Sequence, residues 1–175
     1  MKRAAFTLIE LLVVISIIGL LSTVAVVATN SSRVKARDAK RVADIVQLQK
    51  ALELYYAVNG QYPLASGSTS PNVQWSTSDD AGWTALQTRM GPYMATLPKD
   101  PTQSASGWAV DANTFTYSYY SAGFGCPQQW YMIVYRLEVA DGKPDPGVTA
   151  CDGTFFQYGG SGSSTQVKTV GTRAQ

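Results

Sequence analysis

Histidine is absent from this sequence of 175 residues. Its absence removes catalytic triads, imidazole bases and most zinc sites from consideration. Nucleophile motifs and glycine-rich phosphate loops are missing as well, so an enzyme is the least favoured class of function. The formal net charge is only +2, which provides no general attraction to nucleic acid, and we predict no nucleic-acid partner.

Cysteine is nearly absent, since Cys126 and Cys151 are the two examples and both lie in the C-terminal half. If that half is exported, a disulfide between them is expected. It would close a loop of about 26 residues and stabilise the fold by about 3.5 kcal/mol on the chain-entropy model. In a cytosolic domain the same two residues would be free thiols.

Charged residues are missing from positions 11–32. A helix of this length, at about 1.5 Å per residue, covers the roughly 30 Å hydrocarbon core of a bilayer. Glu10 lies at the start of the run, and no basic side chain follows it before Arg33. A charged side chain in a membrane helix costs about 2.5–3.5 kcal/mol at the helix centre and less near the interface. Glu10 therefore either pairs with a cation of another chain or stays solvated among the lipid head groups.

The start of the chain combines a short basic leader, Lys2-Arg3-Ala4-Ala5, with the segment Phe6-Thr7-Leu8-Ile9-Glu10-Leu11. This combination resembles the class III signal of type IV prepilins and type II secretion pseudopilins. The resemblance implies that a prepilin peptidase cleaves between Ala5 and Phe6 and methylates the new amino group. The family usually has glycine before that bond, and Ala5 keeps the position small.

The same resemblance implies how the subunits assemble. Glu10 would pair with the Phe6 amine of a neighbouring subunit, so the partners are the prepilin peptidase, an inner-membrane assembly platform and further copies of the chain in a helical filament. The implied function is that of a structural subunit of a type IV pilus-like filament, for which adhesion, motility, DNA uptake and secretion are the known roles. A type II secretion pseudopilin and a membrane-anchored surface domain that does not polymerise are the alternatives.

The implied precursor is a single-pass protein of the cytoplasmic membrane with its N-terminus inside, found later in an extracellular pilus or a periplasmic pseudopilus. The positive-inside rule conflicts with this orientation, because the uncharged run is followed by Arg33, Lys35, Arg37, Lys40 and Arg41. Such a cluster fits a solvated face, contacts with neighbouring subunits, or contacts with lipid phosphates or nucleic acid. An ordinary secretory signal peptide that is cleaved after Ala28 is a further alternative. The apolar region of such a peptide has about 7–15 residues, so it is shorter than the uncharged run of this chain.

Proline is absent between positions 11 and 62, and Gly19 is the only glycine before Gly60. We therefore predict one helix from Phe6 to Asn59, about 80 Å long at 1.5 Å per residue, ended by a left-handed Gly60. Residues 6–32 form its apolar, membrane-spanning and filament-core half, and residues 33–60 form its amphipathic half. The predicted apolar stripe is Val42, Ile45, Leu48, Leu52 and Tyr55. The predicted polar side is Arg37, Arg41, Asp44, Gln47 and Lys50, with Lys40 paired to Asp44.

After the helix, residues 61–158 are predicted to form a globular head, and residues 159–175 a flexible tail or an edge strand. A short helix is expected through Trp83, Leu86 and Met90, with Ser78-Asp79-Asp80 at its start and Gly91-Pro92 at its end. Sequence patterns predict three strands, at 115–119, 130–137 and 154–158. The fold class is α+β: residues 1–5 are a leader, and a long N-terminal helix packs on a small antiparallel sheet.

Three aspartates lie in the turn-rich connection 140–153, namely Asp141, Asp145 and Asp152. Oxygen ligands in a glycine-containing loop suit calcium, and the resemblance to major pseudopilins implies a calcium site in a comparable loop. Aspartates are also ordinary turn residues, so a purely structural role is the alternative. No other cofactor is predicted.

Overall fold

The computed structural model describes residues 6–67, 74–159 and 166–173, apart from the side chains of residues 24–28 and 173. The chain divides into two compact units, Met1–Ala36 and Arg37–Gln175, which we call the stem and the head and describe separately. The predicted leader, residues 1–5, lies outside the described residues.

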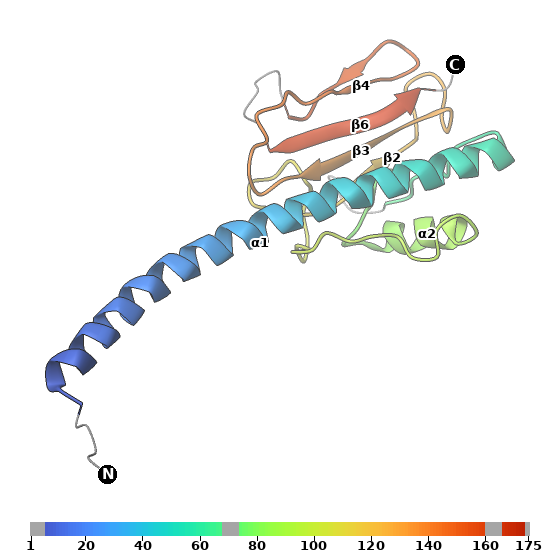
Figure 1. Ribbon diagram of the computed structural model, residues 1–175. Helices are drawn as coiled ribbons and strands as arrows, with labels where there is room; N and C mark the ends of the chain where they lie inside the picture. The colour runs from blue at the N-terminus through green and yellow to red at the C-terminus, as the bar shows by residue number, and fades with distance from the viewer. Residues whose placement is uncertain (1–5, 68–73, 160–165, 174–175) are drawn as a thin grey trace. The chain divides into compact units, whose positions relative to one another are not determined.

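Helix α1 (Leu8–Asn59) has 52 residues and starts at Leu8 rather than at the predicted Phe6 (Figure 1). Its predicted end is confirmed. Gly60 adopts a φ of 66°, in the left-handed region, and its N–H donates to the Tyr56 carbonyl at 2.8 Å. A residue with a side chain is strained in this conformation, so glycine ends the helix at low cost.

The stem exposes its apolar side chains on all sides of α1. The large hydrophobic residues of the segment 6–21 are between 45% and 81% exposed. The hydroxyls of Ser16 and Ser22 donate to the carbonyls of Leu12 and Ile18, so these polar groups are satisfied within the helix. In the part of the chain that the structure describes, no helix combines the length and apolarity that a membrane crossing requires.

The head is built on an antiparallel sheet with the strand order β1-β2-β3-β6, and Figure 1 shows β2, β3 and β6 side by side in this order. Its strands are β1 (Ser76–Thr77), β2 (Ser118–Tyr120), β3 (Trp130–Arg136) and β6 (Val167–Arg173). β3 and β6 pair over their whole length, from Trp130 opposite Arg173 to Arg136 opposite Val167. A separate hairpin joins β4 (Val148–Thr149) to β5 (Phe155–Phe156). The α+β fold class is therefore confirmed.

Of the three predicted strands, one is confirmed and two are only partly correct. The strand at 130–137 is confirmed as β3, whereas β2 begins only at Ser118 and the segment 154–158 contributes only β5, outside the main sheet. For the C-terminal segment the strand alternative is correct, and β6 equals β3 in length with 7 residues. β1 is not predicted, because two residues are too few to show an alternating pattern.

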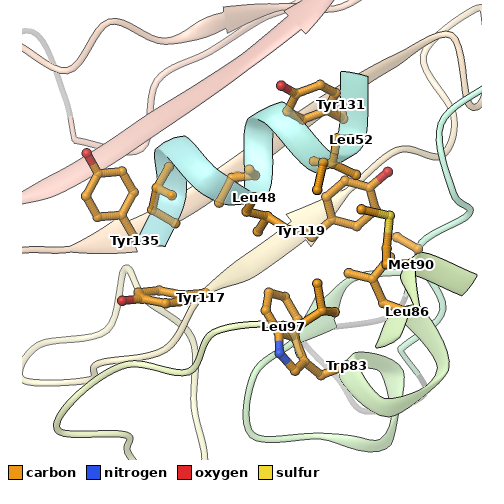
Figure 2. Packing of buried hydrophobic residues seen from close by; sticks show 14 of the residues in the cluster. Leu48, Leu52, Trp83, Leu86, Met90, Leu97, Tyr117, Tyr119, Tyr131 and Tyr135 are labelled. Carbon is orange, nitrogen blue, oxygen red and sulfur yellow. The ribbon is translucent and has the colours of Figure 1, made fainter. Parts of the chain in front are cut away.

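The first core of the head lies between α1, α2 (Ala81–Met90) and one face of the sheet (Figure 2). α2 starts as predicted, since the Asp80 carboxylate accepts from the Trp83 N–H at 3.2 Å. Alternate residues of β3 belong to this core, because successive side chains of a strand point to opposite faces of the sheet. Residues in this core include Ile45, Leu48, Leu52, Trp83, Leu86, Met90, Tyr117, Tyr119, Tyr131, Ile133, Tyr135 and Leu137.

The buried face of α1 differs from the predicted apolar stripe. Ile45 and Leu48 are buried as predicted, but Val42 is 44% exposed. Arg41 is fully buried instead, and Asp44 is 8% exposed, so placing these two residues on the polar side is wrong. At 3.6 residues per turn, position 41 lies above positions 45 and 48 on one face. The charge of Arg41 conceals that periodicity.

A second core, which is not predicted from the sequence, covers the opposite face of the sheet. The remaining alternate residues of β3, Trp130, Met132 and Val134, are buried there. Their neighbours are mostly aromatic and include Trp75, Trp108, Tyr120, Phe156 and Tyr158. Ring centroids lie 4.9 Å apart in the Trp75–Tyr120 and Trp108–Tyr158 pairs, within the range of favourable aromatic contacts. The sheet is thus buried on both faces.

Candidate functional site

The start of α1 carries a capping box made by Thr7 and Glu10. The Glu10 oxygen Oε2 accepts hydrogen bonds from the Thr7 N–H at 2.8 Å and from the Thr7 hydroxyl at 2.7 Å. In return, the Thr7 hydroxyl oxygen accepts from the Glu10 N–H at 3.3 Å. This reciprocal arrangement satisfies donors that a helix N-terminus otherwise leaves unpaired. The Glu10 carboxylate is therefore held beside the first turn of the helix.

The surroundings of this carboxylate are apolar. Glu10 borders a shallow hollow of about 510 Å³ whose other lining residues are Phe6, Ile9, Val13 and Val14. Both side-chain bonds of Glu10 go to Oε2, so within the described residues Oε1 has no donor. A carboxylate accepts about four hydrogen bonds. The site therefore keeps room for a cationic donor from another molecule, on a surface that a partner would dehydrate.

The predicted processing site adjoins this surface. Phe6 precedes the helix and is 74% exposed. Ala5, on the other side of the predicted cleavage, lies outside the described residues. Cleavage between Ala5 and Phe6 and methylation of Phe6 stay predictions.

Cys126 and Cys151 form the predicted disulfide, with their Cα atoms 5.8 Å apart and a sequence separation of 25 residues. Cys151 lies in the turn between β4 and β5, and Cys126 lies in the segment before β3. Both residues pack against the second core. The bond thus ties the separate hairpin to the main sheet.

We expect the Cys126→Ser/Cys151→Ser double variant to lose about 3.5 kcal/mol of unfolding free energy, because the unfolded chain is no longer cross-linked over a loop of about 26 residues. Urea titration of the full chain in detergent measures this loss through tryptophan fluorescence, since all 4 tryptophans lie in the head. Wild-type protein in excess reductant should behave like the double variant. A loss below about 1 kcal/mol would contradict a stabilising role.

Asp145, one of the three predicted calcium ligands, is buried and acts as a structural acceptor. Its Oδ1 accepts from the N–H groups of Gly147 and Thr169, and its Oδ2 accepts from the Gly159 N–H at 2.7 Å and the Thr169 hydroxyl at 2.8 Å. These bonds attach the connection around Asp145 to β6. The four donors match the roughly four hydrogen bonds that a carboxylate accepts.

Asp141 and Asp152 have partners of their own. Asp141 pairs at 2.8 Å with the Nζ of Lys168, which also donates to the Lys143 carbonyl at 2.6 Å. Asp152 accepts from the Thr154 N–H at 2.9 Å. Within the described ranges, no three acidic, histidine or cysteine side chains gather so that they could hold a metal ion. The structure therefore does not bring the three predicted ligands together, and calcium binding stays a prediction.

A buried charge cluster, which is not among the features predicted from the sequence, connects α1 to the rest of the head. The Arg41 guanidinium donates to both oxygens of Asp100 at 2.7 and 2.8 Å, to Asp38 at 2.7 Å and to Glu138 at 2.6 Å. It also lies 4.7 Å from the centroid of the Phe115 ring. The side chains of Arg41 and Asp100 are both 0% exposed. Since a buried charge is costly unless it is fully paired, we expect this cluster to favour one packing of the α1 residues of the head against the rest of the head.

Glu138 gives the cluster a pH dependence. Hydrogen bonds from Arg37, and then from Arg41, outweigh partial burial and lower the pKa of Glu138 from 4.5 to about 2. A carboxyl whose pKa is depressed in the folded state contributes stability that is complete above its unfolded pKa and is lost as the pH falls through the folded pKa.

We therefore expect the unfolding free energy of the head to fall as the pH drops from about 4.5 to about 2, with a smaller drop in the Glu138→Gln variant. Urea titrations of both proteins across this range measure the difference in slope. Equal slopes would show that other carboxyl groups carry the acid sensitivity.

Two family descriptions match the chain. "Prokaryotic N-terminal methylation motif" covers residues 1–26, and "Type II secretion system (T2SS), protein G" covers residues 27–125. The second match takes in more than half of the chain and ends before β3, so the disulfide, β3 and β6 lie beyond it.

Curated relatives of the chain carry the name type II secretion system core protein G. The protein from Vibrio cholerae is 34% identical over 122 residues, which is 70% of this chain and 73% of the relative. The proteins from Aeromonas hydrophila and Escherichia coli are each 35% identical over 100 residues, which is 57% of this chain and 68% and 67% of the relatives. No solved structure gives a significant match.

Proposed function

Since the chain belongs to the type II secretion system protein G family, we propose that it is a pseudopilin, which assembles through α1 into the filament of a secretion machine. It is a structural protein and not an enzyme. The names of the relatives favour the pseudopilin over the extracellular pilus subunit that the resemblance implies first, and they give no support to adhesion or motility.

Glu10 carries the proposal, because it combines an open carboxylate oxygen with apolar surroundings. In the proposed mechanism, cleavage between Ala5 and Phe6 frees an amine, which is methylated and then pairs with Glu10 of the adjacent copy. A charge pair buried among apolar helices adds little net stability, but an incorrect register leaves both charges unpaired. The pair therefore selects the register of the filament.

Before assembly, the stem is proposed to lie in the cytoplasmic membrane with its N-terminus inside and the head in the periplasm. Support comes from the uncharged run 11–32 and the matched methylation motif. The disulfide supports an exported head, since such bonds persist mainly in oxidising compartments. The prepilin peptidase and an inner-membrane assembly platform are the proposed partners at this stage.

Mass spectrometry of the mature chain tests the proposal. We expect an N-terminus at Phe6 with the added mass of one methyl group. A mature chain that begins near Thr29 would indicate an ordinary signal peptide, and one that keeps Met1 would indicate a plain membrane anchor. Shearing of intact cells then distinguishes the two filament types, because a long pilus is released into the medium and a short pseudopilus is not.

A further inference from the structure

The five basic residues at positions 33–41, directly after the uncharged run, fall into two groups. Three of them form ion pairs within the head, namely Arg37–Glu138, Lys40–Asp44 and Arg41–Asp100. The other two, Arg33 and Lys35, belong to the stem and are exposed, and neither has an ion pair among the described residues. The cations that stabilise the head are therefore distinct from two that remain available to another molecule.

Arg33 and Lys35 point to opposite sides of α1. A separation of two residues in an α-helix corresponds to a rotation of about 200° and a rise of about 3 Å. A protein that docks on one side of the helix would contact one of these side chains and leave the other in solvent. A layer of ligands that surrounds the helix at one level would contact both.

We propose that Arg33 and Lys35 bind the phosphate groups of anionic phospholipids at the outer surface of the cytoplasmic membrane. This inference rests on the proposed function, in which the stem spans that membrane before assembly. Residues 11–32 then fill the hydrocarbon core, and Arg33 emerges directly into the head-group layer. The long aliphatic parts of both side chains lie along apolar surface while their cations reach the phosphates.

The ion pairs of the head distinguish Arg37 and Arg41 from Arg33 and Lys35. Arg37 and Arg41 lie close to Arg33 and Lys35 in the sequence, but carboxylates of the head already neutralise their charges. They therefore have little charge left to attract a lipid phosphate. Replacement of Arg33 and Lys35 alone should remove the lipid preference that this flank of the stem provides.

Lipid selectivity of the reconstituted full chain tests the proposal. The chain is placed in phosphatidylcholine vesicles that contain traces of spin-labelled phosphatidylglycerol or phosphatidylcholine, and electron spin resonance gives their relative association constant. We expect the wild type to prefer phosphatidylglycerol. In the Arg33→Gln/Lys35→Gln variant, the relative association constant at low salt should fall by a factor of about five for each charge removed. Added salt should weaken the preference of the wild type.

The matched control is Lys50→Gln/Lys99→Gln, which removes two exposed cations of the head and should keep the wild-type preference. Lys2 and Arg3 are present in every variant, so differences report only the substituted residues. Unchanged selectivity in the Arg33→Gln/Lys35→Gln variant would overturn the proposal. An equal loss in the control would overturn it too, since net charge alone would then explain the effect.

If the Arg33→Gln/Lys35→Gln variant failed to assemble into filaments but kept normal lipid selectivity, the inference would also be overturned. The two cations would then contact a neighbouring subunit rather than lipid. Failure of the proposed function gives a different result. An anchor that is never processed at Phe6 would still show the lipid preference and its loss in the Arg33→Gln/Lys35→Gln variant.

Discussion

Glu10→Ala should abolish filament assembly while the chain stays in the membrane with a folded head. Glu10 is the only acidic residue among positions 1–37, so in the proposed filament the substitution would leave the Phe6 amine of the adjacent copy without a partner in an apolar environment. Loss of one member of a buried charge pair costs about 3–5 kcal/mol, which weakens each subunit contact more than about 100-fold. Crosslinking and immunoblotting of membrane fractions measure assembled and unassembled protein in the same cells.

Two further variants separate the charge of Glu10 from its role in the capping box. Glu10→Gln keeps an acceptor for the Thr7 donors but removes the charge, and we expect it to fail as fully as Glu10→Ala. Thr7→Val removes the hydroxyl and keeps the charge, so a milder defect is expected. Normal assembly of Glu10→Ala would contradict a role of the Glu10 charge in assembly, and a wild type with no assembled protein would indicate an anchor that does not polymerise.

Features with a local cause are those that the sequence predicts well. Gly60 ends α1 because its own backbone adopts the left-handed conformation, and Asp80 starts α2 through a bond to a residue three positions later. The residue pattern of positions 130–137 predicts the strand β3. Cys126 and Cys151 have no other cysteine with which to pair. Each of these signals is contained in a few neighbouring residues or in one residue type.

Features that depend on distant partners are those that the sequence does not predict. Arg41 shares the helix face of Ile45 and Leu48, but a charged residue is buried only where partners meet it, and Asp100 and Glu138 lie 59 and 97 positions away. The same reason applies to Asp145. In a turn-rich loop it resembles a calcium ligand until its donors around β6 are known.

Replacement of Arg41 by methionine should have the largest effect on the stability of the head. Arg41→Met leaves Asp100 buried without its principal partner, and stranding one charge of a buried pair costs about 3–5 kcal/mol. Methionine is flexible and apolar, so it fills the space beside Phe115 and the loss reports the charge rather than a cavity. Urea titration of the full chain in detergent, followed by tryptophan fluorescence, gives the free energy of unfolding.

Two comparisons identify the source of that loss. Arg37→Met also removes a cation that pairs with Glu138, but the Arg37 side chain is 33% exposed, so its loss should be only about 0–1 kcal/mol. Addition of Asp100→Leu to Arg41→Met removes the stranded carboxylate and should restore part of the stability, because apolar pairs often replace buried ion pairs without loss. If Arg41→Met costs no more than Arg37→Met, the buried pair does not hold α1 on the sheet. If the double variant restores nothing, Asp38 and Glu138 rather than Asp100 are the partners whose stranding destabilises the head.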